Sequence, residues 1–148
     1  MIFKLSSIAR VSLITVFAAS TAFADLRIGA HYWPTPNTSF LDGRSLAHFA
    51  QPTESGALQS ALWGCVRNGG SRFHEGIDLK ALSRDHRGEA TDAIFAFDKG
   101  AIQYVNRDPS KSSYGRYIVI EHSHWMPGLV TIYAHLAQEI HTIFFSFN

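Results

Sequence analysis

The sequence contains little cysteine and has no excess of charge of either sign. One cysteine, Cys65, is present in 148 residues, which excludes a framework of intrachain disulfides. Lysine and arginine number 13 against 12 acidic residues, and no basic stripe is visible. A nucleic-acid partner would require such a stripe, so none is predicted. We expect Cys65 to be a small buried residue, with reactivity or pairing to a second chain as the alternative.

Long apolar runs are absent beyond the first 24 residues. This N-terminal stretch begins with Lys4 and Arg10, continues with a short apolar run over 11–20, and ends with Ala22-Phe23-Ala24. That layout is typical of a secretory signal peptide. A membrane anchor is the alternative, but it would need about 20 apolar residues. The sequence therefore predicts a signal peptide over 1–24 and an exported, periplasmic or secreted protein without a transmembrane segment after cleavage.

Cleavage of the signal would remove two positive charges and no negative ones, so the net charge would change as +1 − 2 = −1. Residues 25–62 begin with many turn-forming residues and are expected to be an irregular lead-in. The remainder, 63–148, has the alternation of strands and the turn signals of hairpins, with no long helical periodicity. We expect an all-β domain with a mainly antiparallel sheet. Its clearest strands are predicted at 93–97 and 101–105, which form a hairpin, and at 117–122 and 129–136.

The segment Arg72-Phe73-His74-Glu75-Gly76-Ile77-Asp78-Leu79 contains a histidine and an aspartate four residues apart. In an extended backbone His74, Gly76 and Asp78 point to one side, and Gly76 leaves space between the other two. An imidazole and a carboxylate in that arrangement are suitable ligands for zinc. The alternative is a surface turn with a satisfied His–Asp pair, which the spacing alone favours.

A second segment, 130–136, alternates apolar and polar residues. Strand periodicity places Val130, Ile132, Ala134 and Leu136 on one face, which is expected to be core. The other face carries Thr131, Tyr133 and His135, which line either a groove or an ordinary polar surface. His122 and His124 form a His-x-His pair where a strand runs into a turn. We interpret them as a strand-end and a loop histidine rather than as metal ligands.

In order and spacing, the motifs over about 63–136 resemble the lysostaphin-type zinc endopeptidases that cut peptidoglycan. The resemblance implies an antiparallel β-sheet core crossed by a groove. It implies that His74 and Asp78 are two zinc ligands and that His135 is a groove histidine that assists catalysis. The substrate it implies is a peptide cross-link of the bacterial cell wall, with peptidoglycan peptides as partners.

The His-x-His segment that would supply the third zinc ligand in this family has no counterpart after Leu136. His141 lacks both the partner histidine and the expected distance along the chain. We therefore expect an incomplete zinc site, with weak or absent zinc binding and little activity in the sequence as given. The alternative function is a non-catalytic module of the same fold that binds cell wall or activates another hydrolase.

Overall fold

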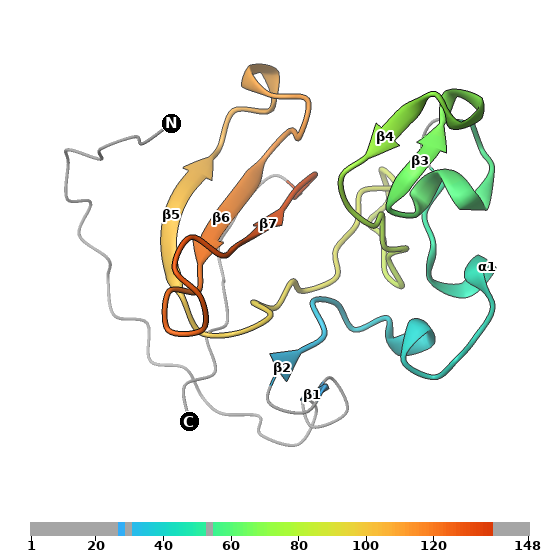
Figure 1. Cartoon of the computed structure of the whole chain (residues 1–148). Coiled ribbons are helices and arrows are strands. Elements are labelled where there is room, and N and C mark those ends of the chain that lie inside the picture. Colours follow the sequence, from blue (N-terminus) through green and yellow to red (C-terminus); the bar gives the residue numbers. More distant parts are fainter. Residues whose placement is uncertain (1–26, 29–30, 53–54, 138–148) are drawn as a thin grey trace.

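Antiparallel strands dominate the architecture, as the sequence predicts. The computed structural model describes residues 27–28, 31–52 and 55–137. Strands outnumber helical turns among these residues, and every strand pair is antiparallel. Figure 1 shows a three-stranded sheet on one side and a two-stranded hairpin on the other. The predicted signal peptide and the segment 138–148, which includes His141, lie outside the described residues.

The larger sheet has the order β5 (Ala101–Asn106), β6 (Tyr117–Glu121), β7 (Val130–Tyr133). The central strand, β6, alternates in burial and carries the core residues Ile118 and Ile120. Ala96 completes this core cluster, and Val105, Tyr133 and Leu136 pack against it. The expected strands at 117–122 and 129–136 are therefore present, although each is shorter than predicted.

The faces of β7 are reversed relative to the sequence prediction. Residues opposite one another in antiparallel strands share a face, and β7 places Tyr133 opposite Ile118 and Thr131 opposite Ile120. Thr131 and Tyr133 therefore lie on the core side. Val130 and Ile132 are instead substantially exposed. The alternation within β7 is compatible with either face of the strand toward the core. The register with the buried isoleucines of β6 determines which face it is.

The predicted hairpin over 93–105 is half correct. Its second arm is β5, but 93–97 is not a strand of this sheet, and β5 pairs with β6. The first arm bonds to the lead-in instead. The amide of Tyr32 donates to the carbonyl of Phe97 at 2.8 Å, and the amide of Phe95 donates to the carbonyl of Pro34 at 2.9 Å. The turn at 98–100 therefore does not close a hairpin. It connects β5 to a segment that is hydrogen-bonded to the lead-in.

The second half of the molecule is built on the hairpin of β3 (Gly64–Arg67) and β4 (Arg72–His74). A small core of Phe49, Ala50 and Ala61 lies beside it, with Leu46, Leu62 and Leu79 packed around it. The lead-in contributes short elements, in keeping with its irregular sequence. These are β1 (Arg27–Ile28), β2 (His31–Tyr32), η2 (Thr38–Phe40), α1 (Leu46–Phe49) and η3 (Leu58–Ala61), and later turns form η4 (Asn68–Gly70) and η5 (Pro109–Lys111).

Two further expectations bear on the described residues. Cys65 lies on β3 and is exposed, so the expectation that it is buried is wrong. Its neighbour across the hairpin is Phe73, which is also half exposed, and neither core cluster of the described residues includes Cys65 or Phe73. In the part of the chain that the structure describes, no helix has the length and apolar character needed to cross a membrane.

Candidate functional site

His74 and Asp78 meet in the structure, as their spacing predicts. His74 is the last residue of β4, and the chain turns through Gly76 to bring Asp78 back beside it. The Nε2 atom of His74 lies 3.4 Å from Oδ1 of Asp78. Both side chains are largely shielded, with 11% and 15% of their surface exposed. The two side chains thus form a partly shielded His–Asp pair, although the residues between them, 75–77, are exposed.

A backbone carbonyl fixes the tautomer of His74. The Nδ1 atom lies 2.8 Å from the carbonyl oxygen of Leu62. A carbonyl can only accept, so Nδ1 carries the hydrogen, and in the neutral ring Nε2 carries the lone pair. That lone pair faces the carboxylate of Asp78. Metal-binding histidines are commonly oriented in this way by a hydrogen bond from their other nitrogen.

The spacing of the two acceptors fits a bound cation. Two ligands about 2.1 Å from zinc at a tetrahedral angle lie about 3.4 Å apart, which is the observed separation of Nε2 of His74 and Oδ1 of Asp78. A proton between them would make an ordinary His–Asp ion pair. We refer to His74, Asp78 and the groups that hold them as the half-site.

Three consecutive carbonyls at the end of η3 hold the half-site. Nε of Arg67 donates to the carbonyl of Ser60 at 3.3 Å, the amide of Asp78 donates to that of Ala61 at 2.8 Å, and Leu62 holds the imidazole. The guanidinium of Arg67 also lies 2.6 Å from Oδ2 of Asp78. One carboxylate oxygen is therefore bound by Arg67, and the other faces the imidazole.

Sequence reasoning overlooked Arg67, because nothing in its spacing resembles a ligand pattern. The signal that could have found it is chemical: a shielded carboxylate requires a compensating cation. We predict that Arg67→Met lowers the free energy of unfolding by about 2 kcal/mol, since a hydrogen bond to a charged group is lost at a shielded site.

Urea denaturation at pH 7 measures this effect, and Arg87→Met is the matched control. The pair between Arg87 and Asp85 is 3.8 Å long, and the arginine is mostly exposed. Such surface pairs contribute about 0–1 kcal/mol. Equal losses in the two variants would show that Arg67 is no more important than a surface cation.

Tyr114 connects the segment that carries His135 with the residue next to His74. The amide of His135 donates to the carbonyl of Tyr114 at 2.9 Å, and the Tyr114 hydroxyl donates to the carboxylate of Glu75, the neighbour of His74. The bond to Glu75, together with partial burial, holds the pKa of Tyr114 above its ordinary value. Figure 1 shows the end of β7 directed toward β4. A single residue thus links the half-site to the segment that carries His135.

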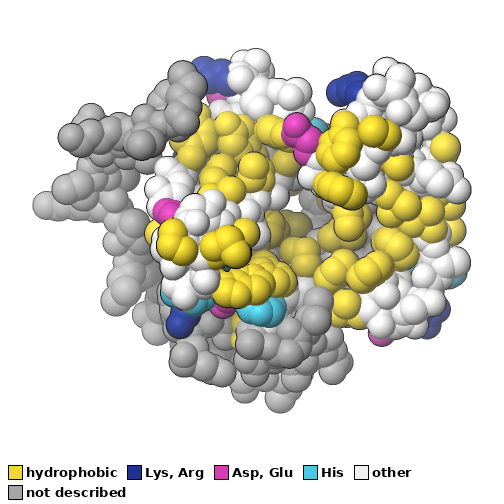
Figure 2. Space-filling view, viewed as in Figure 1, with side chains coloured by type: hydrophobic (Ala, Val, Ile, Leu, Met, Phe, Trp, Pro, Cys, Tyr) yellow, Lys and Arg dark blue, Asp and Glu magenta, His cyan; other side chains and the backbone are white. Residues whose placement is uncertain are grey.

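The backbone of His135 is unusual for a residue with a side chain. Its φ is 55°, in the left-handed region that non-glycine residues seldom adopt. The amide of the next residue, Leu136, donates to the carbonyl of Arg116 at 3.0 Å and helps to keep the chain in this turn. The side chain of His135 is exposed. Figure 2 shows a hollow between the two halves of the molecule, with hydrophobic side chains gathered on both sides of it.

The structure does not assemble a complete metal site from the residues it describes. Over 27–28, 31–52 and 55–137, no three or more His, Cys, Asp or Glu side chains are grouped so that they could hold a metal ion. His74 and Asp78 are together, whereas His135 is not grouped with them as a third ligand. The catalytic role that the resemblance implies for His135 stays a prediction.

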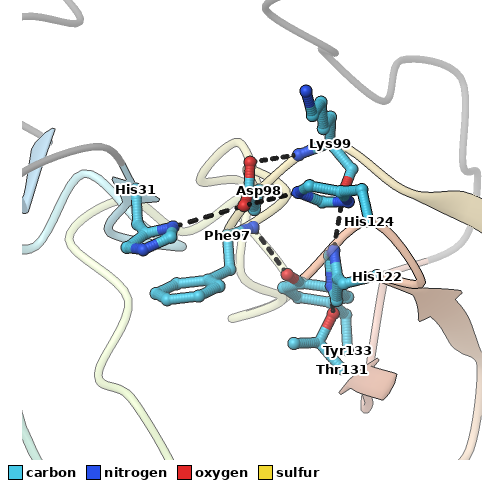
Figure 3. Close-up of polar contacts among 8 residues, drawn as sticks. All are labelled: His31, Phe97, Asp98, Lys99, His122, His124, Thr131 and Tyr133. Atoms are coloured by element: carbon cyan, nitrogen blue, oxygen red, sulfur yellow. Dashed lines mark hydrogen bonds and ion pairs between the residues drawn. The ribbon is translucent and has the colours of Figure 1, made fainter. Parts of the chain in front are cut away.

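The His-x-His pair belongs to a different set of polar contacts, which Figure 3 shows. His122 is fully buried, with Nδ1 2.8 Å from the carbonyl of Lys99 and Nε2 2.9 Å from Oγ1 of Thr131. Both nitrogens are thereby occupied within the protein. His124 instead pairs with Asp98. The interpretation of these two histidines as a strand-end and a loop residue fits their positions after β6.

Comparison of the chain with protein-family models, with curated proteins and with solved structures found no match. Functional conclusions therefore depend on the half-site itself and on the pattern of motifs in the sequence.

Proposed function

We propose that this protein is related to the lysostaphin-type zinc endopeptidases and acts on peptide cross-links of bacterial peptidoglycan. The observation that carries the proposal is the half-site. A histidine whose lone pair is oriented by a carbonyl faces a carboxylate at the separation that two zinc ligands require. The strand-rich antiparallel architecture is compatible with the fold of that family.

Each residue of the site has a definite part in this proposal. His74 and Asp78 would bind the metal, and Arg67 would hold the carboxylate so that one oxygen faces it. Bound zinc lowers the pKa of a coordinated water to about 7 and polarises a carbonyl. His135, exposed beside Tyr114, would accept or donate a proton at the substrate.

In this proposal His74 and Asp78 are two protein ligands, and catalytic zinc usually has three. The two ligands alone should bind zinc weakly and orient a water poorly. We therefore propose that a third ligand is needed for catalysis and that residues 27–137 by themselves hydrolyse little or no substrate.

The second candidate is a non-catalytic module that binds cell wall, and one observation favours it. Trp63 is 65% exposed and packs edge-on against the half-exposed Phe73 at a centroid distance of 5.2 Å. Trp63 directly precedes β3, and Phe73 lies on β4 next to His74. Exposed aromatic rings of this kind are suitable for contact with the apolar faces of a ligand.

Zinc titration tests the zinc proposal. We expect the full chain to bind zinc weakly, and a segment with a family-type His-x-His joined after Leu136 to raise the affinity sharply. His74→Ala should abolish that gain, since it removes one of three ligands. His86→Ala, which removes an exposed loop histidine, is the matched control and should change nothing.

Peptidoglycan zymography and wall pull-down separate the two candidate functions. An extended chain that binds about one zinc and clears the gel supports the peptidase. An extended chain that folds, binds no zinc and still pulls down wall fragments supports the binding module and removes the metal assignment of His74 and Asp78.

A further inference from the structure

A second cluster of ionisable side chains lies away from the half-site, where the lead-in meets the three-stranded sheet. The carboxylate of Asp98 faces two histidines from distant parts of the chain. Its Oδ2 lies 3.4 Å from Nδ1 of His31 on β2 and 3.1 Å from Nε2 of His124. Figure 3 shows the carboxylate between the two rings. The same carboxylate oxygen thus lies close to two imidazoles, one from the lead-in and one from the segment after β6.

Aromatic packing places His31 beside this carboxylate. Its ring stacks on Phe97 at 4.5 Å and on Trp125 at 4.7 Å, with interplanar angles of 12° and 19°. The neighbouring amide of Tyr32 donates to the carbonyl of Phe97. Among the residues that the structure describes, Nδ1 of His31 is nevertheless buried without a hydrogen-bond partner. The approach to Asp98 is therefore close but is not an established hydrogen bond.

Asp98 is ionised over a wide pH range. Burial acts to raise the pKa of Asp98, but the amide of Lys99 and the two histidines outweigh it and hold that pKa below its ordinary value. Imidazole side chains ordinarily titrate near pH 6.5. The ionised carboxylate of Asp98 therefore faces two imidazole rings, and imidazole is the side chain that most readily gains a positive charge when the pH falls below neutrality.

Other ionisable groups surround the cluster from each packed element. The ring of His122 lies 6.3 Å from that of His124, and its nitrogens contact Lys99 and Thr131. In Figure 3 the amine of Lys99 points away from the carboxylate. On β7, the Tyr133 hydroxyl accepts from the amide of Phe97, and burial raises the pKa of Tyr133. Tyr133 therefore stays neutral through the relevant range, and a charge on His122 would oppose one on His124.

We propose that His31, Asp98 and His124 form a pH-sensitive clasp, which holds the lead-in against the three-stranded sheet more tightly when the two imidazoles are protonated. A protonated imidazole carries a hydrogen on both nitrogens, so Nδ1 of His31 and Nε2 of His124 can then both donate to Asp98 with a full positive charge behind each bond. As the pH rises through the range where imidazoles lose their proton, the charged attraction disappears and the lead-in is held by stacking and backbone bonds alone. The clasp does not depend on the proposed enzymatic function.

Amide hydrogen exchange of the full chain, followed by NMR at pH 5.5 and 7.5, tests the clasp. Exchange is expressed as protection factors to remove the intrinsic pH dependence. We expect the amides of Tyr32 and Phe95, which bridge lead-in and sheet, to be roughly three- to tenfold better protected at pH 5.5, as one or two partly exposed ion pairs would give. The amide of Val119 on β6 reports global opening.

Asp98→Asn should remove this pH dependence, and Asp108→Asn is the matched control. Asp108 also has a lowered pKa, but its causes are bonds from Ser110 and a nearby Lys111. If Asp98→Asn also lowers the protection of Val119, the variant destabilises the whole fold. In that case His124→Gln and His31→Gln are used to test whether the pH dependence is lost. Equal protection at both pH values in the wild-type chain, or an unchanged pH dependence in the clasp variants, would overturn the proposal.

Discussion

Replacing Gly100 with alanine is expected to destabilise the fold by about 3 kcal/mol, the upper range for overpacking a closely packed site. A Cβ atom at Gly100 would lie 2.5 Å from the carbonyl oxygen of Glu121 and 2.6 Å from Cγ2 of Ile120. It would also lie 2.9 Å from Nδ1 of His122. Two of these neighbours are backbone or buried core, so they cannot simply swing away.

The surroundings of Gly100 are fixed from several directions. Lys99 precedes it and its carbonyl holds the buried ring of His122, whose other nitrogen contacts Thr131 on β7. If the turn shifted to make room for a methyl group, it would weaken the contacts of His122 with Lys99 and Thr131, which connect the start of β5 with β7. Relaxation is expected to remove little of the overpacking penalty.

Urea denaturation of Gly100→Ala and Gly76→Ala measures this expectation. Gly76 is a matched control, because a Cβ there would meet nothing within 4 Å and its φ is not in the left-handed region. The control should change the free energy of unfolding by less than about 1 kcal/mol, since an exposed position tolerates alanine. Similar losses at both positions would show that close packing at Gly100 is not the cause.

Replacing Ile132 with lysine is expected to shift the chain from associated species to monomer. Ile132 is 49% exposed, and its register partner Val119 is in turn opposite Tyr104. These three side chains form an apolar row across the sheet. Among the described residues β7 pairs only with β6, so no described strand covers its other edge. An apolar edge strand of this kind favours association with a second chain.

Size-exclusion chromatography and light scattering over a range of concentrations measure the effect. Ile77→Lys is the matched control, because Ile77 is also 49% exposed but lies in the loop between the two half-site residues, outside any strand. We expect Ile132→Lys to reduce the associated fraction severalfold while Ile77→Lys leaves it unchanged. If both lysines act alike, general hydrophobicity rather than the edge of β7 controls association.

The sequence predicted correctly those features that depend on residues close together in the chain. The run 117–122 is rich in β-branched residues and became β6, and its alternation matches the burial of Ile118 and Ile120. The spacing of His74 and Asp78 likewise led to a contact in the structure. In both cases the relevant information lies within a few residues of the chain.

Interactions between distant segments were beyond this kind of reasoning. The run 93–97 has the pattern of a strand, yet its backbone bonds to the lead-in, some sixty residues earlier in the sequence. The faces of β7 depend on β6, and Asp98 gains its importance only from His31 and His124. None of these partners can be identified from periodicity, because periodicity describes one element at a time.

The three carbonyls at the end of η3 have a consequence for how the molecule is assembled. The contacts of Arg67 and His74 with Ser60, Leu62 and Asp78 close loops of only 7 to 12 residues. The contact of Tyr114 with the half-site spans 39 residues. Loop-closure entropy rises with length, so the shorter contacts can form without the longer one. The half-site can thus be preorganised within its own stretch of chain, before the segment that carries His135 is in place.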